Sequence, residues 1–330
     1  MRVQVVDRMP TVISTFAGCG GSSLGYKLAG YRELLAVEWD DNAVATFRLN
    51  FPEVPVYHGD IAKLSGEECM RLAGGIKPGE LDVLDGSPPC QGFSTAGRRK
   101  FDDPRNSLFR EFARLLTELK PRAFVMENVT GMIKGYMKQA YLQIVATLRD
   151  CGYTVKGQVM NAMYFNVPQS RERVILIGVR NDLSIEPSHP KPQMRPISAG
   201  DACLNVVNKT FKRPLATVAT AIWNAVNLGQ NGTHYRPGYY MNSLKVDPRK
   251  PMPTIPKVCP GTGGLMHWKE RRTLTIEELK RGASFPDDFQ MCGKFDLQWQ
   301  RIGNSVPPNL MRAIAEHVKT EILDHATPRL

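Results

Sequence analysis

Short apolar runs alternate with helical patterns along the first 180 residues of the chain. Turn residues bound these runs, as they bound buried strands, and the runs cover residues 12–16, 34–38, 54–57, 81–84, 123–126, 155–160 and 174–179. Helices are expected between them, at 22–29, from about 42, at 109–119 and at 141–148. This alternation predicts an α/β fold with a parallel sheet that is covered by helices on both faces.

The pattern changes after Arg180. Residues 185 to about 271 are rich in proline, glycine and asparagine and show little periodicity. A structureless stretch of that length is uncommon inside a compact chain, so we expect a small, loop-rich domain there rather than a linker. Helical periodicity returns at 275–280 and, more strongly, at 308–322.

The composition permits one large domain, or one large and one small, because 42% of the 330 residues are hydrophobic. The net charge is +11 and the isoelectric point is near 9.3. An enzyme of small metabolites has no need for this surplus, whereas a protein that approaches a polyanion does. Charge alone fits a nucleic-acid partner and a generally basic surface equally well.

The seven cysteines are odd in number and widely spaced, without a CxxC pair. This pattern argues against a disulfide framework and against a zinc cluster, so no metal is expected. No apolar run reaches the length of about 18 residues that suits a membrane span. We therefore expect a cytoplasmic protein without membrane contact.

A glycine-rich turn, FAGCGG at 16–21, follows the first expected strand. Glycines let a backbone approach a ligand closely, although this turn departs from the GxGxxG fingerprint. The second strand ends in Glu38-Trp39-Asp40, where a carboxylate suits ribose hydroxyls and an aromatic face suits adenine. The third strand leads to Asp60, which could bond an exocyclic amine. Together these strand ends predict an adenosine site at the carboxyl edge of the sheet.

The fourth strand leads into GSPPCQGFS, in which two prolines fix the backbone immediately before Cys90. A lone cysteine is more often a small core residue, but this loop is typical of an exposed thiolate nucleophile. The core reading is kept for Cys69, Cys151, Cys203 and Cys292.

Charged residues occupy the next two strand boundaries. Glu127 lies at the end of the fifth expected strand, where a carboxyl group can protonate a ring nitrogen. Arg171 and Arg173 precede the last strand and can serve a carbonyl oxygen and a phosphate. One of these two arginines is expected to form an internal salt bridge instead.

Six motifs occur in order along the chain: FAGCGG, EWD, GSPPCQGFS, ENV, QSRER and GNSVPP. Together they resemble the DNA (cytosine-5)-methyltransferase family, in particular its prokaryotic restriction-modification members. The resemblance covers about 11–180 and 254–323 and is weak between them, where this family has its variable target-recognition region. It implies a Rossmann-like S-adenosylmethionine-dependent methyltransferase sheet with a second, smaller, loop-rich target-recognition domain.

The resemblance also implies a division of the chain. Residues 1–184 would form the catalytic and cofactor-binding domain, 185–285 the target-recognition domain, and 286–330 a C-terminal segment that returns to the catalytic domain. S-adenosylmethionine would be the cofactor, S-adenosylhomocysteine its product, and double-stranded DNA the partner. A cognate restriction endonuclease that acts separately, a monomeric state and association with the nucleoid through DNA are further expectations.

Residue roles follow from the same resemblance. Cys90 would add to carbon 6 of a flipped cytosine, Glu127 would engage N3 and the exocyclic amine, and Arg173 would hold O2, with Arg171 supporting the loop or a phosphate. Cofactor contacts are expected from Phe16, Gly18, Gly20, Glu38, Trp39, Asp60, Ile61, Pro89, Leu108, Asn304 and Ser305. DNA contacts are expected from Gln91, Ser94, Arg98, Arg99, Arg105 and Arg236. Other polar residues of 185–253, Lys212 and Arg213 among them, are candidate readers, but most are expected to be solvated.

Three alternatives remain. A transfer-RNA cytosine methyltransferase would share the fold, but ENV carries no second cysteine and no Cys-Phe-Thr segment occurs, so DNA is favoured. A catalytically inactive DNA-binding protein is opposed by the intact motifs. A nicotinamide-dependent oxidoreductase is suggested only by the glycine turn and the strand order, and it leaves PPCQ, ENV and QSRER without a role.

Overall fold

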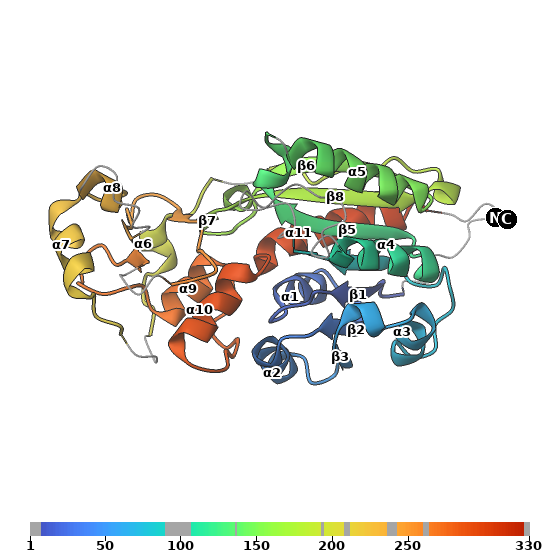
Figure 1. Ribbon diagram of the computed structural model, residues 1–330, viewed down its shortest axis with the longest axis horizontal. Helices are drawn as coiled ribbons and strands as arrows, with labels where there is room; N and C mark the ends of the chain where they lie inside the picture. Colours follow the sequence, from blue (N-terminus) through green and yellow to red (C-terminus); the bar gives the residue numbers. More distant parts are fainter. Residues whose placement is uncertain are drawn as a thin grey trace.

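The computed structural model describes residues 8–89, 107–135, 137–192, 195–207, 212–235, 243–259 and 264–326. A seven-stranded sheet with the order β3-β2-β1-β4-β5-β8-β6 forms its centre (Figure 1). The strands are β1 (Thr11–Thr15), β2 (Arg32–Glu38), β3 (Val56–His58), β4 (Val83–Gly86), β5 (Ala123–Val129), β6 (Tyr153–Asn161) and β8 (Glu172–Arg180). The first five pair in parallel, and the predicted α/β class is confirmed.

Helices cover both faces of this sheet (Figure 1). They are α1 (Gly21–Leu28), α2 (Asp41–Asn50), α3 (Gly66–Leu72), α4 (Ser107–Leu119), α5 (Met137–Asp150) and, from the end of the chain, α11 (Pro308–Val318). Successive residues of a strand point to opposite faces of the sheet. Val83 and Val125 share an apolar cluster with α1 and α11, whereas Leu84 and Phe124 share one with α4 and α5.

One strand, β8, runs against the direction expected for a parallel sheet. β8 pairs antiparallel with both β5 and β6. Only residues 162–171 separate β6 from β8, and they hold the short helix η5 (Ala162–Tyr164) and strand β7 (Gln169–Ser170). A parallel crossover needs about a dozen residues or more, so β8 runs back beside β6 instead. Its first residue, rather than its last, therefore lies at the carboxyl edge of the parallel strands.

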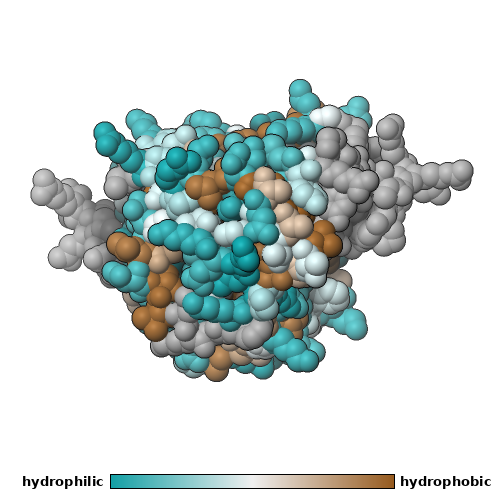
Figure 2. Space-filling model, turned by 90° about the vertical axis from the view of Figure 1, so that its left-hand side faces the viewer, coloured by the Kyte–Doolittle hydropathy of each residue, from teal (hydrophilic) through white to brown (hydrophobic). Residues whose placement is uncertain are grey.

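Short elements fill the segment after β8. They are α6 (Ala199–Ala202), α7 (Thr217–Ala225), α8 (Gly232–Tyr235), β9 (Leu244–Lys245), β10 (Met252–Pro253), β11 (Leu265–Met266) and α9 (Ile276–Gly282). In Figure 1, α7 and α8 lie at the end of the molecule away from the sheet, and that end shows a largely hydrophilic face in Figure 2. One apolar cluster contains Ala36 and Phe47 together with Leu265 and Leu274. Residues before and after position 184 thus share a core, and the domain boundary expected at 184 stays a prediction.

The C-terminal elements return to the sheet. They are α10 (Phe295–Asn304), α11 and the π-helical turn η7 (Lys319–Leu323). α11 packs directly on α1, where a Cβ on Gly25 would lie 2.6 Å from the Cβ of Met311 and 2.7 Å from the carbonyl oxygen of Pro308. Only glycine allows this approach, because real Cβ contacts are longer.

Replacing Gly25 by alanine is expected to lower the free energy of unfolding by about 1–3 kcal/mol, because the new methyl overpacks the contact with α11. Helix propensity acts in the opposite direction, since alanine is favoured over glycine by about 1 kcal/mol. Urea unfolding measures the difference. Gly131→Ala is the control, since nothing lies within 4 Å of its added Cβ. Equal stability of the two variants would contradict the packing argument.

Candidate active site at the carboxyl edge of the sheet

The ends of the parallel strands and the start of β8 meet at one edge of the sheet. Five segments lie there, and we call them the rim: residues 16–21, 38–40, 86–89, 127–129 and 171–173. Parallel α/β sheets bind ligands at this edge, because loops and helix starts converge on it. The rim therefore collects the residues that the motifs singled out.

The glycine turn bends sharply between β1 and α1. Phe16, Gly18 and Gly20 all have positive φ, at 55°, 57° and 93°. A Cβ on Gly20 would clash with the ring of Phe51, whereas none of the described residues lies within 4 Å of the Cβ position of Gly18. The turn is thus closed against the protein at Gly20 and open at Gly18.

Glu38 holds this turn in place. Its carboxylate accepts the backbone N–H of Gly18 at 2.8 Å, and those of Trp39 and Asp40 at 2.9 Å each. A carboxylate has about four acceptor positions, so one remains for a ligand hydroxyl. The sequence predicted the ligand contact but not this second use of the side chain.

The neighbouring groups leave an open aromatic face. Trp39 is 77% exposed, which is unusual for a tryptophan in a protein of this size. Asp40 caps α2 and pairs with Arg301 of α10 at 3.0 Å. Asp60 is exposed and caps the short helix η1 (Ile61–Lys63), and Ile61 is buried behind it. The predicted cofactor residue Leu108 is partly buried against the cluster on the α4 face.

A carboxylate and a guanidinium lie together at the end of β5. Oε1 of Glu127 is 2.7 Å from Nε of Arg173, and both side chains are mostly buried. The antiparallel register sets Val129 opposite Arg173, which brings the two charges to the same side of the sheet. As expected, one of the two arginines forms an internal ion pair, and it is the one predicted to hold a substrate oxygen.

Asn128 connects this pair to the loop of the predicted nucleophile. Its Nδ2 donates to the carbonyl oxygen of Pro88 at 3.0 Å, and its Oδ1 accepts the N–H of Val129 at 2.8 Å. Pro88 is buried and Pro89 is exposed. Cys90 follows directly in the sequence, but it lies outside the described residues, as do the predicted DNA contacts Gln91, Ser94, Arg98, Arg99, Arg105 and Arg236.

Arg171 supports the rim from inside. It is 2% exposed and donates to the carbonyl oxygens of Ile255 at 3.4 Å and Gly303 at 3.0 Å. Burial, and then the nearby charge of Arg173, lower the pKa of Arg171 to about 9, so it remains a cation at neutral pH. A side chain buried in this way cannot contact a phosphate. Of its two expected uses, only the support of the loop fits the structure.

The C-terminal motif closes the rim behind the glycine turn. A Cβ on Gly21 would meet the carbonyl oxygen of Val306, and Oγ of Ser305 lies 3.1 Å from Sγ of Cys19. Asn304 is exposed beside it. Ser305 is thus a wall of the turn, while Asn304 is open to a ligand.

Several polar side chains of the variable segment are engaged within the protein. Lys212 pairs with Glu270 at 3.3 Å, and Arg213 pairs with Asp296 at 2.7 Å. Both of these candidate readers of DNA therefore form ion pairs within the protein. The expectation that most such residues do not read DNA is in line with these contacts.

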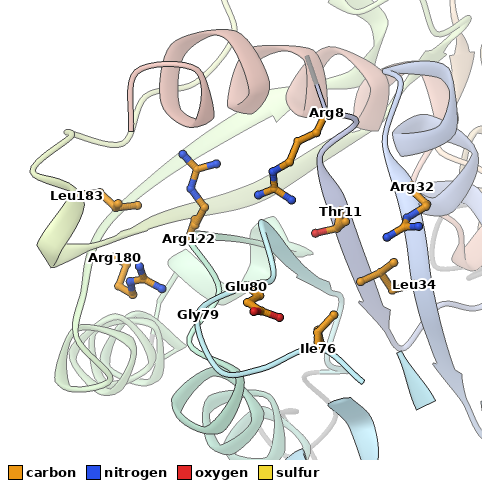
Figure 3. Close-up of a pocket in the computed structure, with 10 residues that line it drawn as sticks. All are labelled: Arg8, Thr11, Arg32, Leu34, Ile76, Gly79, Glu80, Arg122, Arg180 and Leu183. Atoms are coloured by element: carbon orange, nitrogen blue, oxygen red, sulfur yellow. The ribbon is translucent and has the colours of Figure 1, made fainter. Parts of the chain in front are cut away.

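A cavity lies away from the rim. It has a volume of about 570 Å³ and opens at the amino ends of the parallel strands, where Arg8, Arg32, Arg122 and Arg180 line it (Figure 3). Arg8 and Arg122 share the buried carboxylate of Asp82 there. Within the described ranges, no group of three or more His, Cys, Asp or Glu residues could hold a metal ion, and no helix is long and apolar enough to cross a membrane.

Residues 10–320 match the family described as C-5 cytosine-specific DNA methylase. The chain belongs to this family. The Type II methyltransferase M1.HphI of Haemophilus parahaemolyticus is 36% identical over 329 residues, which cover 93% of this chain and 86% of the relative. M.NgoFVII of Neisseria gonorrhoeae is 30% identical over 332 residues, which cover 94% and 86%.

Solved structures show the same fold. A candidate DNA modification methyltransferase encoded within a prophage of Escherichia coli has a TM-score of 0.79 at 24% identity, over 95% of this chain and 99% of its own. A mutant DNMT2 of Spodoptera frugiperda has a TM-score of 0.68 at 17% identity, over 94% and 98%. The resemblance seen in the motifs is confirmed, and the chain is a DNA cytosine methyltransferase.

Two residues that support the rim of this methyltransferase were missed in the sequence. Asn128 stands inside the ENV motif, but its spacing does not reveal a contact with Pro88. Arg301 lies on α10, a helix that was not predicted, and pairs with Asp40, which lies 261 residues earlier in the sequence. Only its place just before GNSVPP could have drawn attention to it.

Replacing Asn128 by alanine should lower kcat for DNA methylation about tenfold, because the loss of one buried hydrogen bond of about 1–2 kcal/mol frees the segment before Cys90. Initial rates at saturating substrates measure the effect. Asn309→Ala is the matched control, since Asn309 makes the same kind of bond, to the Asn166 carbonyl at 2.8 Å, away from the rim. If both variants kept the wild-type rate, Asn128 would not position the loop.

Proposed function

We propose that this chain is a sequence-specific DNA (cytosine-5)-methyltransferase that uses S-adenosylmethionine and flips its target cytosine out of the duplex. The observation that carries the proposal is the Glu127–Arg173 pair at 2.7 Å. Asn128, next to Glu127, holds the segment that leads to Cys90. A carboxyl group and a guanidinium on the rim, with a cysteine next in the chain after it, match the chemistry of a cytosine ring.

The pair is complementary to one edge of cytosine. A carboxyl group can donate a proton to N3 and accept from the exocyclic amine, while a guanidinium donates to O2. These contacts draw electron density from the ring and make carbon 6 open to a nucleophile. Glu127 is assigned the first two contacts and Arg173 the third.

Cys90 supplies the nucleophile in this proposal. Its thiolate adds to carbon 6 while N3 takes a proton from Glu127, and the resulting enamine is nucleophilic at carbon 5. After carbon 5 has been methylated, a base removes its proton, the bond between carbon 6 and sulfur breaks, and the N3 proton returns to Glu127. These steps release the thiolate and restore the aromatic ring. The thiolate cannot reach a stacked base, so the cytosine must leave the duplex.

The other half of the rim fits the cofactor. The ring of Trp39 is open to solvent, Glu38 keeps one acceptor position, and no described residue fills the space beside Gly18. S-adenosylmethionine supplies an electrophilic methyl group on a sulfonium centre. The remaining contacts are assigned to Phe16, Gly20, Asp60, Ile61, Pro89, Leu108, Asn304 and Ser305, which would bind S-adenosylhomocysteine after the reaction.

DNA is the partner in this proposal, and the net charge of +11 favours its approach. The relatives are Type II methyltransferases, which supports a role in restriction and modification. The proposal includes a separate endonuclease, a monomeric state and association with the nucleoid. Residues 185–285 are assigned the readout of the site.

Mapping of 5-methylcytosine at single-base resolution tests this function. The purified protein is incubated with S-adenosylmethionine and mixed-sequence duplex DNA, and one short context should be methylated to completion. Methylation of transfer RNA and not of DNA would favour the RNA alternative. An absence of methylation on both would refute the proposal.

Cys90→Ser is expected to abolish methyl transfer while S-adenosylhomocysteine still binds within about threefold of wild type, since a serine hydroxyl is a far weaker nucleophile than a thiolate at neutral pH. Titration calorimetry and a methyl-transfer assay measure the two properties. Cys151→Ser is the control and should remain active, because that cysteine lies at the end of α5, away from the rim. A Cys90→Ser variant that turned over near the wild-type rate would exclude the covalent route.

A further inference from the structure

A carboxyl group is buried in the middle of the sheet, directly below the rim. Asp85 lies on the central strand β4 and is 3% exposed. β1 and β5 flank it, with Ser14 and Val125 as its neighbours in register. Its Oδ1 accepts the hydroxyl of Tyr26, a wholly buried residue of α1, at 3.2 Å. In the described part of the chain Asp85 forms no ion pair with a lysine, arginine or histidine.

An unpaired carboxylate in such a place is costly, so the protonated form is favoured. Burial raises the pKa of Asp85 well above its usual value, and the charge of Glu33 and then that of Glu127 raise it further. Hydrogen bonds from Tyr26 and Ser22 act in the opposite direction but do not reverse the shift. Glu33 itself, on β2, has a pKa raised to about 7 by burial, so it becomes charged near neutral pH.

Asp85 connects the glycine turn, through α1, with the strand that leads to Cys90. Its contacts Tyr26 and Ser22 lie on α1, the helix that follows the glycine turn. Its own carbonyl oxygen accepts the hydroxyl of Thr15, the last residue of β1, at 2.9 Å. Pro89, directly before Cys90, lies four residues after Asp85 in the segment that follows β4.

We infer that Asp85 is a positioning residue that, as a neutral acid, fastens α1 and the glycine turn to the strand that carries the nucleophile loop. Ionisation of Asp85 places an unpaired charge between α1 and β4 and loosens both. The inference rests on the proposed function for the roles of the glycine turn and Cys90. It goes beyond that function by making cofactor binding depend on one proton below the site.

The affinity for S-adenosylhomocysteine between pH 6 and 10 tests this inference, with kcat for DNA methylation as a second readout. Asp85→Ala should weaken binding about tenfold or more at pH 7, and Asp85→Asn should restore it to within about threefold, because asparagine is a neutral isostere. Wild type should lose affinity toward alkaline pH, whereas Asp85→Asn should not. Asp182→Asn, at an exposed carboxylate paired with Arg180, is the control and should follow wild type.

Two further variants should shift, in opposite directions, the pH at which the affinity for S-adenosylhomocysteine is lost. Tyr26→Phe removes a hydrogen bond that lowers the pKa of Asp85, so the loss of affinity should move to higher pH. Glu33→Gln removes a charge that raises this pKa, so the loss should move to lower pH. A merely structural role for Asp85 would not give two shifts of opposite sign.

Stability gives an independent readout. Asp85 keeps its proton in the folded protein and loses it on unfolding above about pH 4, so the folded state is penalised as pH rises above that value. Asp85→Asn should therefore have a higher Tm than wild type at pH 8 and a smaller advantage at pH 5.

The outcomes are separable. If wild type binds S-adenosylhomocysteine and Asp85→Ala binds it equally well, the inference is overturned and the proposed function stands. An alkaline loss that persists unchanged in Asp85→Asn also overturns it. If wild type does not bind S-adenosylhomocysteine at any pH, the proposed function fails and the inference fails with it.

Discussion

The antiparallel pairing of β8 with β5 is the constraint on which the site depends. Because β8 runs against its neighbour, its first residues lie where the parallel strands end, and Arg173 meets Glu127 there. A parallel β8 would carry QSRER to the opposite edge, beside the arginine-lined cavity. The short link from β6 excludes that arrangement, so a limit on chain length decides where the guanidinium lies.

The motifs located the charged residues of the rim, but not the residues that hold these in place. Glu127 and Arg173 come from separate motifs, and the structure brings them within 2.7 Å. Cys90 stays a prediction because it lies outside the described residues. Asn128, Asp85 and Arg301 act through backbone or buried partners, and no spacing along a single sequence reveals such partners.

In the fold, too, some features could be predicted from the sequence and others could not. Apolar runs predicted the strands to within a few residues, because burial on both faces leaves a continuous hydrophobic signal. Strand direction was wrong for β8, which runs against the other strands, since periodicity carries no direction. The helix α10 was missed because its apolar positions, such as Trp299 and Ile302, are few, although they are fully buried beside Pro256 and the glycine turn.

The contact of α1 with α11 joins residues from the two ends of the chain. Val306 and Ser305 complete the wall of the glycine turn, and both are made long after the turn itself. During synthesis on a ribosome, the sheet strands therefore emerge long before the turn has its second wall. A growing chain can begin to fold around β1 and β4, but its glycine turn lacks this wall until residues 305 and 306 have left the ribosome.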